Sequence, residues 1–555
     1  MHADLSRSTF RPERHYSAVL AQQGRVQLDA DLNEQAAIQL HQTRTLAADL
    51  IGPHGGPAGA TGFRIEYVGG RHDLDTLYIH GGRYYVDGIL CDATRPAPGT
   101  PVPHDDHGHD GGHADAPSDG TSAAGAPSQP PAHWTYWDQP DGFRDPEKPG
   151  DRLPSPAQAP FVAYLKVWER SVTAAEDPAL REVALGAAMP DTAARVKVVW
   201  QVLPLSLGEL DLGGTEPTRE AVGAAFAAWA ARRAAPSARL AARGERPEHA
   251  DEDPCLVAPD ARYRGAENQL YRVEVHAGGK AGEATFKWSR ENGSVALAVD
   301  EFDGCWVTLA SLGFDDKLDL DVGDHVEVVD TAYASRLEAL PLLRVEELDL
   351  PGRRVRLSAE PDRRVGRLPR LNPFLRRWDQ HEGPRRKGRA SALRDGAVRV
   401  EEGEWLPLED GVEVYFAKGG TYRTGDHWIV PARTATGGVE WPSDAARRPL
   451  LRGPAGIARH FAPLALVKGE GEAVDLRNVF GPLAGPVPAA DEAALAEEAR
   501  ARQEELAAES APAAPDAPDA SKTPESPKST ESTAGQRRGR RRSAEPADTT
   551  DEGNR

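Results

Sequence analysis

The sequence predicts a mainly β protein with a few helices, built from antiparallel β-hairpin units in several domains. Three observations lead to this expectation. The chain has 555 residues, which is too long for one compact core. Apolar and polar residues alternate over many short stretches, which is the period of a half-buried strand. Gly-Gly and Asn-Gly dipeptides separate several of these stretches, as tight turns require.

The chain begins with a stretch of 28 residues that we interpret as an extended, polar arm carrying Arg7, Arg11 and Arg14. A helix is expected next, over 31–50, because Asp31 and Glu34 have the spacing of a capping box. Apolar residues then recur at helical spacing. The predicted apolar face of this helix consists of Leu32, Ala36, Leu40, Ala47 and Leu50.

Two arrangements of this N-terminal region are open. The helix packs on its own domain and the arm closes the edge of the chain's own sheet, or arm and helix together dock on a neighbouring subunit. In the second arrangement the arm's arginines would meet an acidic surface. Its apolar anchors would be Phe10, Tyr16, Val19 and Leu20.

The composition divides the whole chain into six units. Pro-, Gly- and His-rich segments indicate linkers or insertions, and a Pro-, Ser- and Thr-rich end indicates disorder. The predicted units are the arm and helix (1–60), a small β-unit (61–92), a His/Pro/Gly-rich insertion or linker (93–157), a central β domain with a helical insertion near 217–243 (158–335), a second β region (336–486), and a helix followed by a disordered tail (487–555).

The clearest local pattern lies in 262–299, where three consecutive strands are predicted. In the first strand Tyr271, Val273 and Val275 alternate with polar residues. The apolar face should therefore meet a core, and the polar face should point outward. That polar face consists of Arg272, Glu274 and His276.

The second strand carries Trp288 on its apolar face and leads into Asn292-Gly293. This dipeptide favours a two-residue type I′ turn, so the second and third strands are expected to form a hairpin. The tip of that hairpin is either a ligand site or a solvent-exposed end with an internal Lys/Arg–Glu pair. Its polar residues are Lys287, Arg290, Glu291 and Asn292.

Charge and composition narrow the classes of function. The net charge is −20 at pH 7, which disfavours sequence-independent DNA binding. The basic cluster Arg537–Arg542 could contact nucleic acid or an acidic surface, or could be part of a solvated tail. Three scattered cysteines suggest a reducing cytoplasm. They are Cys91, Cys255 and Cys305. No signal-like segment or membrane span is expected, so we predict a cytoplasmic protein.

We find no catalytic motif, and we assign no catalytic, cofactor-binding or metal-binding residue. Two clusters were weighed as metal sites. The first is either a weak divalent-metal site or a solvated tract, and comprises His104, Asp105, Asp106, His107, His109, Asp110 and His113. The second lacks EF-hand spacing and indicates a turn before the next strand; it comprises Asp315, Asp316, Asp319, Asp321 and Asp324.

Four regions of the sequence carry a family resemblance. They are STFRPERHYSAVLAQQGRVQLDADLNEQ (8–35), VWERSVTAAEDPALREVALG with VKVVWQV (167–202), YRGAENQLYRVEVH with ATFKWSRENGSV (263–295), and GDHWIVPARTATGGVEWP with HFAPLALV (425–467). They resemble an uncharacterised bacterial family, domain of unknown function 6519. The resemblance spans most of 1–480, so we expect the His-rich insertion and the tail after 486 to lie outside it. Members are similar to proteins encoded among phage-tail-like, contractile injection genes.

Two functions follow as hypotheses. The first is a non-enzymatic structural or accessory component of a phage-tail-like particle, with other subunits of that particle as its partners. The second is a carbohydrate-binding or carbohydrate-active surface protein, in which exposed aromatic residues would stack on sugar rings. The candidate aromatic residues are Trp134, Trp137 and Trp378.

Overall fold

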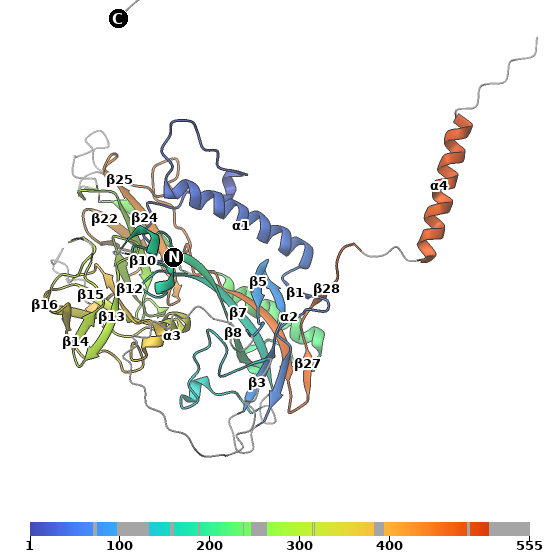
Figure 1. Ribbon diagram of the computed structural model, residues 1–555, viewed down its shortest axis with the longest axis horizontal. Helices are drawn as coiled ribbons and strands as arrows, with labels where there is room; N and C mark the ends of the chain where they lie inside the picture. Colours follow the sequence, from blue (N-terminus) through green and yellow to red (C-terminus); the bar gives the residue numbers. More distant parts are fainter. Residues whose placement is uncertain are drawn as a thin grey trace, which may run out of the picture. The chain divides into compact units, whose positions relative to one another are not determined.

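The computed structural model of the chain describes residues 1–69, 75–96, 133–155, 160–186, 189–236, 238–245, 263–313, 315, 317–381, 393–484 and 489–509. The chain divides into two compact units, Met1–Pro482 and Leu483–Arg555. In the second unit, the predicted helix is confirmed as α4 (Ala489–Glu509). In the first unit, antiparallel sheets dominate, which confirms the predicted mainly β class (Figure 1).

Three sheets in the first unit pack around one core. They are β28-β1-β4-β5 (Val479–Phe480, His54–Pro57, Arg83–Val86, Ile89–Asp92), β2-β3-β6 (Ile65–Val68, Thr76–His80, His133–Thr135) and β27-β26-β7-β8 (Ala473–Asp475, His460–Val467, Phe161–Val172, Arg195–Ser206). The long strands β7 and β8 pair along their whole length. Helix α2 (Arg219–Ala234) covers this region through Val222, Phe226 and Trp229, the residues predicted to share one helical face.

The remaining strands form two smaller sheets, a six-stranded sheet and a closed barrel. The six-stranded sheet is β19-β20-β12-β10-β24-β25 (Leu393–Arg394, Ala397–Arg399, Thr285–Ser289, Gln269–Val275, His427–Arg433, Gly438–Val439). The barrel is β13-β14-β17-β16-β15-β18 (Ala296–Asp303, Trp306–Leu309, Arg354–Leu357, Leu343–Asp349, His325–Val329, Phe374–Trp378). The smaller sheets are β21-β22-β9 (Trp405–Pro407, Val412–Phe416, Leu240–Gly244) and β11-β23 (Gly279–Lys280, Thr421–Tyr422).

The turn at Asn292-Gly293 has the predicted backbone, but the expected hairpin between the second and third strands is wrong. Both residues have positive φ, 54° and 66°. Strand β12 pairs instead with β10 and β20, whereas β13 pairs with β14 and β18 in the barrel. The turn therefore passes the chain from the six-stranded sheet into the barrel, because other strands occupy both edges of β12.

The polar face of β10 does not point outward as expected. Every residue of β10 and of β12 is buried. The apolar face packs in a core with Tyr271, Val273 and Trp288, and the opposite face is covered by the barrel and by the first residues of the chain. A polar face that is closed in this way must satisfy its charges internally.

Helix α1 (Asp29–Ile51) lies on the outside of the first unit (Figure 1). Arg44 donates two hydrogen bonds to Glu169 of β7, at 2.8 and 2.6 Å, and so ties the helix to the sheet. The β4–β5 turn approaches the helix so closely that a Cβ on Gly88 would lie 2.1 Å from the Arg44 carbonyl oxygen. Gly88 also has a φ of 77°, so only glycine fits there without strain.

The short helix α3 (Thr331–Arg336) was not predicted. It begins at Asp330, whose side chain accepts a hydrogen bond from the Tyr333 backbone N–H. Six single-turn 3-10 helices occur among the described residues, at Pro12–Arg14, Pro149–Asp151, Pro178–Leu180, Val183–Leu185, Leu207–Glu209 and Pro369–Leu371.

Candidate functional site

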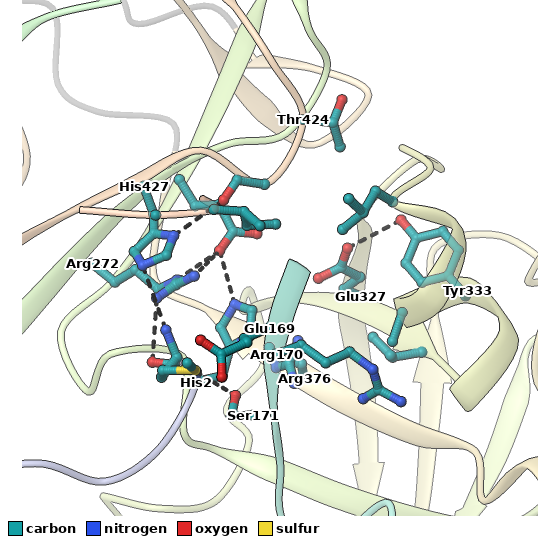
Figure 2. A pocket seen from close by; sticks show the side chains of 18 of the residues that line it. His2, Glu169, Arg170, Ser171, Arg272, Glu327, Tyr333, Arg376, Thr424 and His427 are labelled. Carbon is teal, nitrogen blue, oxygen red and sulfur yellow. Dashed lines mark hydrogen bonds and ion pairs between the residues drawn. The ribbon is translucent and has the colours of Figure 1, made fainter. Parts of the chain in front are cut away.

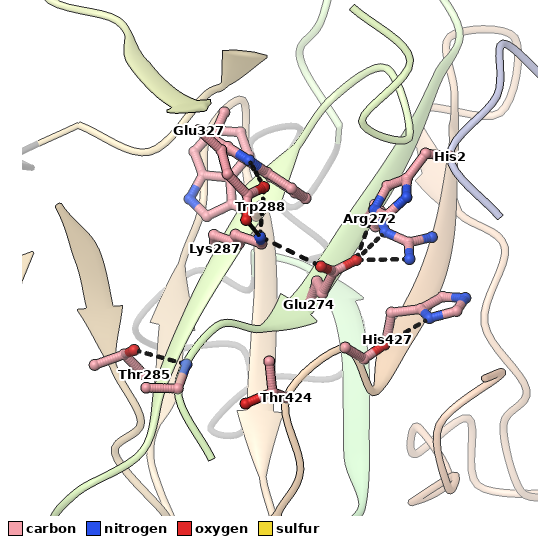
Figure 3. Close-up of polar contacts among 12 residues, drawn as sticks. His2, Arg272, Glu274, Thr285, Lys287, Trp288, Glu327, Thr424 and His427 are labelled. Atoms are coloured by element: carbon pink, nitrogen blue, oxygen red, sulfur yellow. Dashed lines mark hydrogen bonds and ion pairs between the residues drawn. The ribbon is translucent and has the colours of Figure 1, made fainter. Parts of the chain in front are cut away.

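A buried network of charges joins the six-stranded sheet to the barrel (Figure 3). Lys287 of β12 donates to both carboxylate oxygens of Glu327 on β15, each at 2.7 Å. Glu274 of β10 accepts from the Arg272 Nε at 2.6 Å and lies 3.4 Å from the Lys287 ammonium. The imidazole of His2 lies 2.8 Å from the same Glu274 carboxylate. Two carboxylates thus alternate with two cations and a histidine.

The strand period explains how one face holds this network. Arg272 and Glu274 are two residues apart on β10, so their side chains lie on the same side of the sheet. Lys287 is the register partner of Glu274 across the β10–β12 pair. Glu327 arrives from the barrel, where it also accepts hydrogen bonds from the Trp378 indole N–H (3.0 Å) and the Tyr333 hydroxyl (3.1 Å).

The network fixes the protonation states of its members. Burial alone would raise the pKa of Glu274, but Arg272, His2 and Lys287 outweigh burial and hold that pKa well below its usual range. Burial alone would likewise raise the pKa of Glu327, but the charge of Lys287 outweighs burial, and the pKa of Glu327 is lowered. Burial together with the nearby Arg272 lowers the pKa of His2 well below its usual range, so its imidazole is neutral and donates an N–H hydrogen bond to the Glu274 carboxylate.

One side of the network opens into a cavity of about 240 Å³ (Figure 2). Its charged wall comes from β7, β10, β12, β15 and β18, and its apolar wall includes Val329, Ala334, Leu337 and Ile457. The first residues of the chain border it as well. Asn292 anchors them, because its amide donates to the carbonyl oxygens of Met1 (2.9 Å) and Ala3 (2.8 Å).

The carboxylates that line the cavity are tied to cations. Besides the two in the network, Glu169 binds Arg44, Glu176 binds Arg170, and Glu338 binds Arg336. A carboxylate held by a guanidinium is a weak general base, because the pairing favours its charged form. The cavity is therefore arranged to hold charge at fixed positions. Within the described residues, no group of three or more His, Cys, Asp or Glu side chains is placed to hold a metal ion.

A second feature is an exposed apolar surface at the N-terminus. The predicted apolar face of α1 does not pack on its own domain: Leu32, Ala36, Leu40 and Leu50 are exposed, and only Ala47 is half-buried. Ala30 and Ile38, on the other side of the helix, are the buried residues. We define the N-terminal surface as the exposed large apolar residues Tyr16, Leu20, Val26, Leu28, Leu32, Leu40, Leu46 and Leu50.

The structure divides the predicted arm into two parts. Residues 1–9 bind their own chain: Ser6 bonds to the Asp29 carboxylate, and Thr9 donates to Glu34 at 2.6 Å. Beyond them, residues 11–18 and 20–29 are exposed. Of the four predicted anchors, Phe10 and Val19 are half-buried against α1, whereas Tyr16 and Leu20 are exposed.

The polar residues predicted at the hairpin tip are paired with other elements, so the expected internal pair is wrong. Lys287 binds Glu327, Arg290 binds Glu409 through two hydrogen bonds of 2.8 Å, and Glu291 lies 3.1 Å from Lys317. Lys287 alone among these predicted residues borders the cavity.

The acidic stretch before β15 forms the predicted turn. Asp315 accepts backbone hydrogen bonds from 317 and 318, and Asp324 accepts one from Asp321. The remaining member, Asp316, lies outside the described residues, as do Cys255, the His104–His113 tract and the Arg537–Arg542 cluster. Cys91 and Cys305 are free thiols.

The three tryptophans weighed for sugar stacking are not exposed. Trp378, a candidate for an exposed aromatic face, lies in β18 and is completely buried. Trp134 and Trp137 are half-buried against the core of the first three sheets, and the Arg95 guanidinium lies 4.5 Å from the Trp134 ring centroid. Sugar stacking requires an exposed aromatic ring. That requirement is not met by Trp378, and it is met less well by Trp134, whose ring lies against Arg95.

Sequence reasoning missed His2, Glu327, Tyr333 and Arg376 as site residues. They come from three segments that are far apart in the chain and meet only after the barrel has closed on the six-stranded sheet. The one local signal was the alternation Arg272-Val273-Glu274. Residues two apart on a strand lie on the same side of the sheet, so opposite charges at this spacing can interact there.

The fold and site describe a mainly β protein with an enclosed charged cavity and an exposed N-terminal surface. The chain belongs to a family of unknown function, DUF6519, whose model matches residues 1–124, 124–226 and 214–543. These segments include the His-rich tract and most of the C-terminal unit, so our expectation that both lie outside the family is wrong. No curated protein and no solved structure matches the chain. None of the helices in the described part of the chain is long and apolar enough to cross a membrane.

Proposed function

We propose that the protein is a non-enzymatic structural or accessory subunit of a phage-tail-like contractile injection particle, and that it docks through the N-terminal surface. The observation that supports docking is the orientation of α1. Leu32, Leu46 and Leu50 lie within about 40° of one another around the helix axis, and they are 64, 61 and 57 % exposed. A leucine stripe turned to solvent, on a helix that is anchored from its other side, is typical of an interaction surface.

The occupant that we propose is a second copy of this chain. Residues 10–28 carry three arginines, Arg11, Arg14 and Arg25, against one acidic residue, Glu13, whereas the whole chain has a net charge of −20. A basic, apolar arm is complementary to the acidic surface that such a chain presents, and complementary charges favour association and fix its register.

Burial of this surface would stabilise the contact substantially. Each fully buried leucine contributes about 1.5–3 kcal/mol relative to an exposed one. Four exposed leucines on α1 and two apolar residues of the arm that are each 83 % exposed, Leu20 and Val26, are available. Only part of this gain would remain after the loss of translational freedom and side-chain entropy on association.

The proposal is tested by incorporation into particles. Cells that produce the contractile particle would express the wild-type chain, a Leu32→Asp/Leu46→Asp variant, or a Val183→Asp/Leu185→Asp control. The control changes two residues of similar exposure, 72 and 59 %, outside the N-terminal surface. We expect the wild type and the control in the sedimented particle fraction and the first variant in the soluble fraction. Absence of the wild type from the particles contradicts the particle assignment, and full incorporation of the Leu32→Asp/Leu46→Asp variant contradicts the docking surface.

The carbohydrate-binding hypothesis stays a prediction without a specific observation in its favour. A sugar ring stacks on an open aromatic face, and the candidate tryptophans described above are buried or half-buried.

A further inference from the structure

Among the described residues that line the cavity, Arg376 is a cation without an ion pair. Arg170, Arg272 and Lys287 each bind a carboxylate at 2.7 Å or less. Arg376 of β18 differs from them: within the described part of the chain, no carboxylate lies at ion-pair distance and its guanidinium makes no hydrogen bond. Its buried Nε–H has no hydrogen-bond partner among the described residues, and its guanidinium carbon lies 5.1 Å from the centroid of the Phe374 ring.

An unpaired guanidinium in such a place is costly. Burial lowers the pKa of Arg376, and nearby Glu327, Glu274 and Glu176 offset only part of this effect. Figure 2 shows Arg376 among the charged residues that line the cavity, close to Arg170. A buried donor without an acceptor loses the hydrogen bonds that water would supply. A ligand that brings an anionic group to Arg376 would restore them.

We infer that the cavity binds a small monocarboxylate with an apolar body, and that Arg376 holds its carboxylate. A guanidinium presents parallel N–H donors that match the two oxygens of a carboxylate. The apolar lining residues Val329, Leu337 and Ile457 suit a short hydrocarbon group. The volume of about 240 Å³ admits only a small molecule.

The apolar lining decides between the two common anions. Glu176, Glu274 and Glu327 influence the charge of Arg376, but each is itself paired with Arg170, Arg272 or Lys287. Charge alone therefore does not select one anion, whereas phosphate has no hydrocarbon group to cover Val329, Leu337 and Ile457. The site therefore favours a carboxylate with an apolar body.

The experiment is calorimetric titration of the full-length protein with 4-methylpentanoate, its neutral isostere 4-methylpentanamide, and inorganic phosphate. We expect the carboxylate to bind, and the amide and phosphate to bind at least about tenfold more weakly. The amide loses the charge-assisted bidentate contact with the guanidinium, and phosphate lacks a hydrocarbon group for the apolar lining. Absence of carboxylate binding, or equal binding of the amide, overturns the inference. Tighter binding of phosphate overturns the choice of a monocarboxylate.

Variants place the ligand at Arg376. Arg376→Gln should weaken carboxylate binding by about tenfold or more. Arg399→Gln, at an exposed arginine at the end of β20, should leave binding unchanged. The unliganded Arg376→Gln protein should unfold at the wild-type temperature or higher, because an uncompensated charge has been removed. If that variant does not fold, Arg376→Lys is used instead. It keeps the charge but loses the parallel N–H donors of the guanidinium, and it must show the same weakening of carboxylate binding. Wild-type affinity in either variant overturns the assignment to Arg376.

Discussion

The pair between Lys287 and Glu327 offers a quantitative test of the buried network. Substitution of Glu327 by glutamine keeps the side chain's size but removes its charge. Lys287 then retains only Glu274, at 3.4 Å, as a nearby carboxylate. Tyr333 and Trp378 donate to different oxygens of Glu327, and glutamine keeps only one acceptor oxygen, so one of these two donors loses its acceptor together with the ammonium.

The expected cost follows from the burial of both partners. The Lys287 and Glu327 side chains are 4 and 7 % exposed, so solvent screens them little. Removal of one partner from a buried ion pair costs about 3–5 kcal/mol of unfolding free energy. The double variant Lys287→Met/Glu327→Gln removes both charges and should lose much less than Glu327→Gln alone, because replacement of a whole buried pair is often nearly neutral.

Urea denaturation followed by tryptophan fluorescence and circular dichroism measures these differences. The control is Glu347→Gln, which removes an exposed partner of Arg356 on the outside of the barrel and should cause no measurable change. A cost below about 1 kcal/mol for Glu327→Gln would refute the claim of a buried network. So would a double variant whose loss equals the sum of the two single losses, because independent residues behave additively.

Two further predictions concern the same sheet. Trp288 is 4 % exposed in the core of the six-stranded sheet, so Trp288→Ala should cost about 3–5 kcal/mol in the same urea assay, and a loss below about 1 kcal/mol would show that the residue is not core. Burial and the charge of Lys287 lower the pKa of His276 from 6.5 to about 4. A lowered histidine pKa means that the unfolded state takes up protons first, so stability is complete above pH 6.5 and falls as the pH drops toward 4. The loss is on the order of 3 kcal/mol, and thermal unfolding of His276→Gln should show a shallower pH dependence than the wild type. Parallel pH profiles would contradict this contribution.

Local signals predicted much of the fold. Helix α1 covers the expected 31–50, and α2 lies within the helical insertion expected near 217–243. Even the left-handed backbone of Asn292 follows from the Asn-Gly pair. These features depend on residues that are near one another in sequence.

Features that depend on distant partners could not be predicted in this way. One of the two strands that pair with β12 is β20, more than one hundred residues away, and it takes the edge where the third predicted strand was expected; the turn at Asn292 therefore has the predicted backbone but not the predicted pairing. The sequence alone predicts that the polar face of β10 is exposed to solvent. Only the folded barrel, which places Glu327 against this face, shows that it is buried. For α1, the sequence shows an amphipathic helix but does not tell which face its own domain uses.

The most direct test of the central claim is the solution mass of the purified chain. Sedimentation velocity would compare the wild type with the Leu32→Asp/Leu46→Asp variant and the Val183→Asp/Leu185→Asp control over a range of concentrations. A docking N-terminal surface predicts a dimer or larger species for the wild type and the control, and a monomer with unchanged unfolding temperature for the first variant. A wild type that stays monomeric at every concentration, or a Leu32→Asp/Leu46→Asp variant that still assembles, would contradict the proposal that α1 and the arm bind a second copy of this chain.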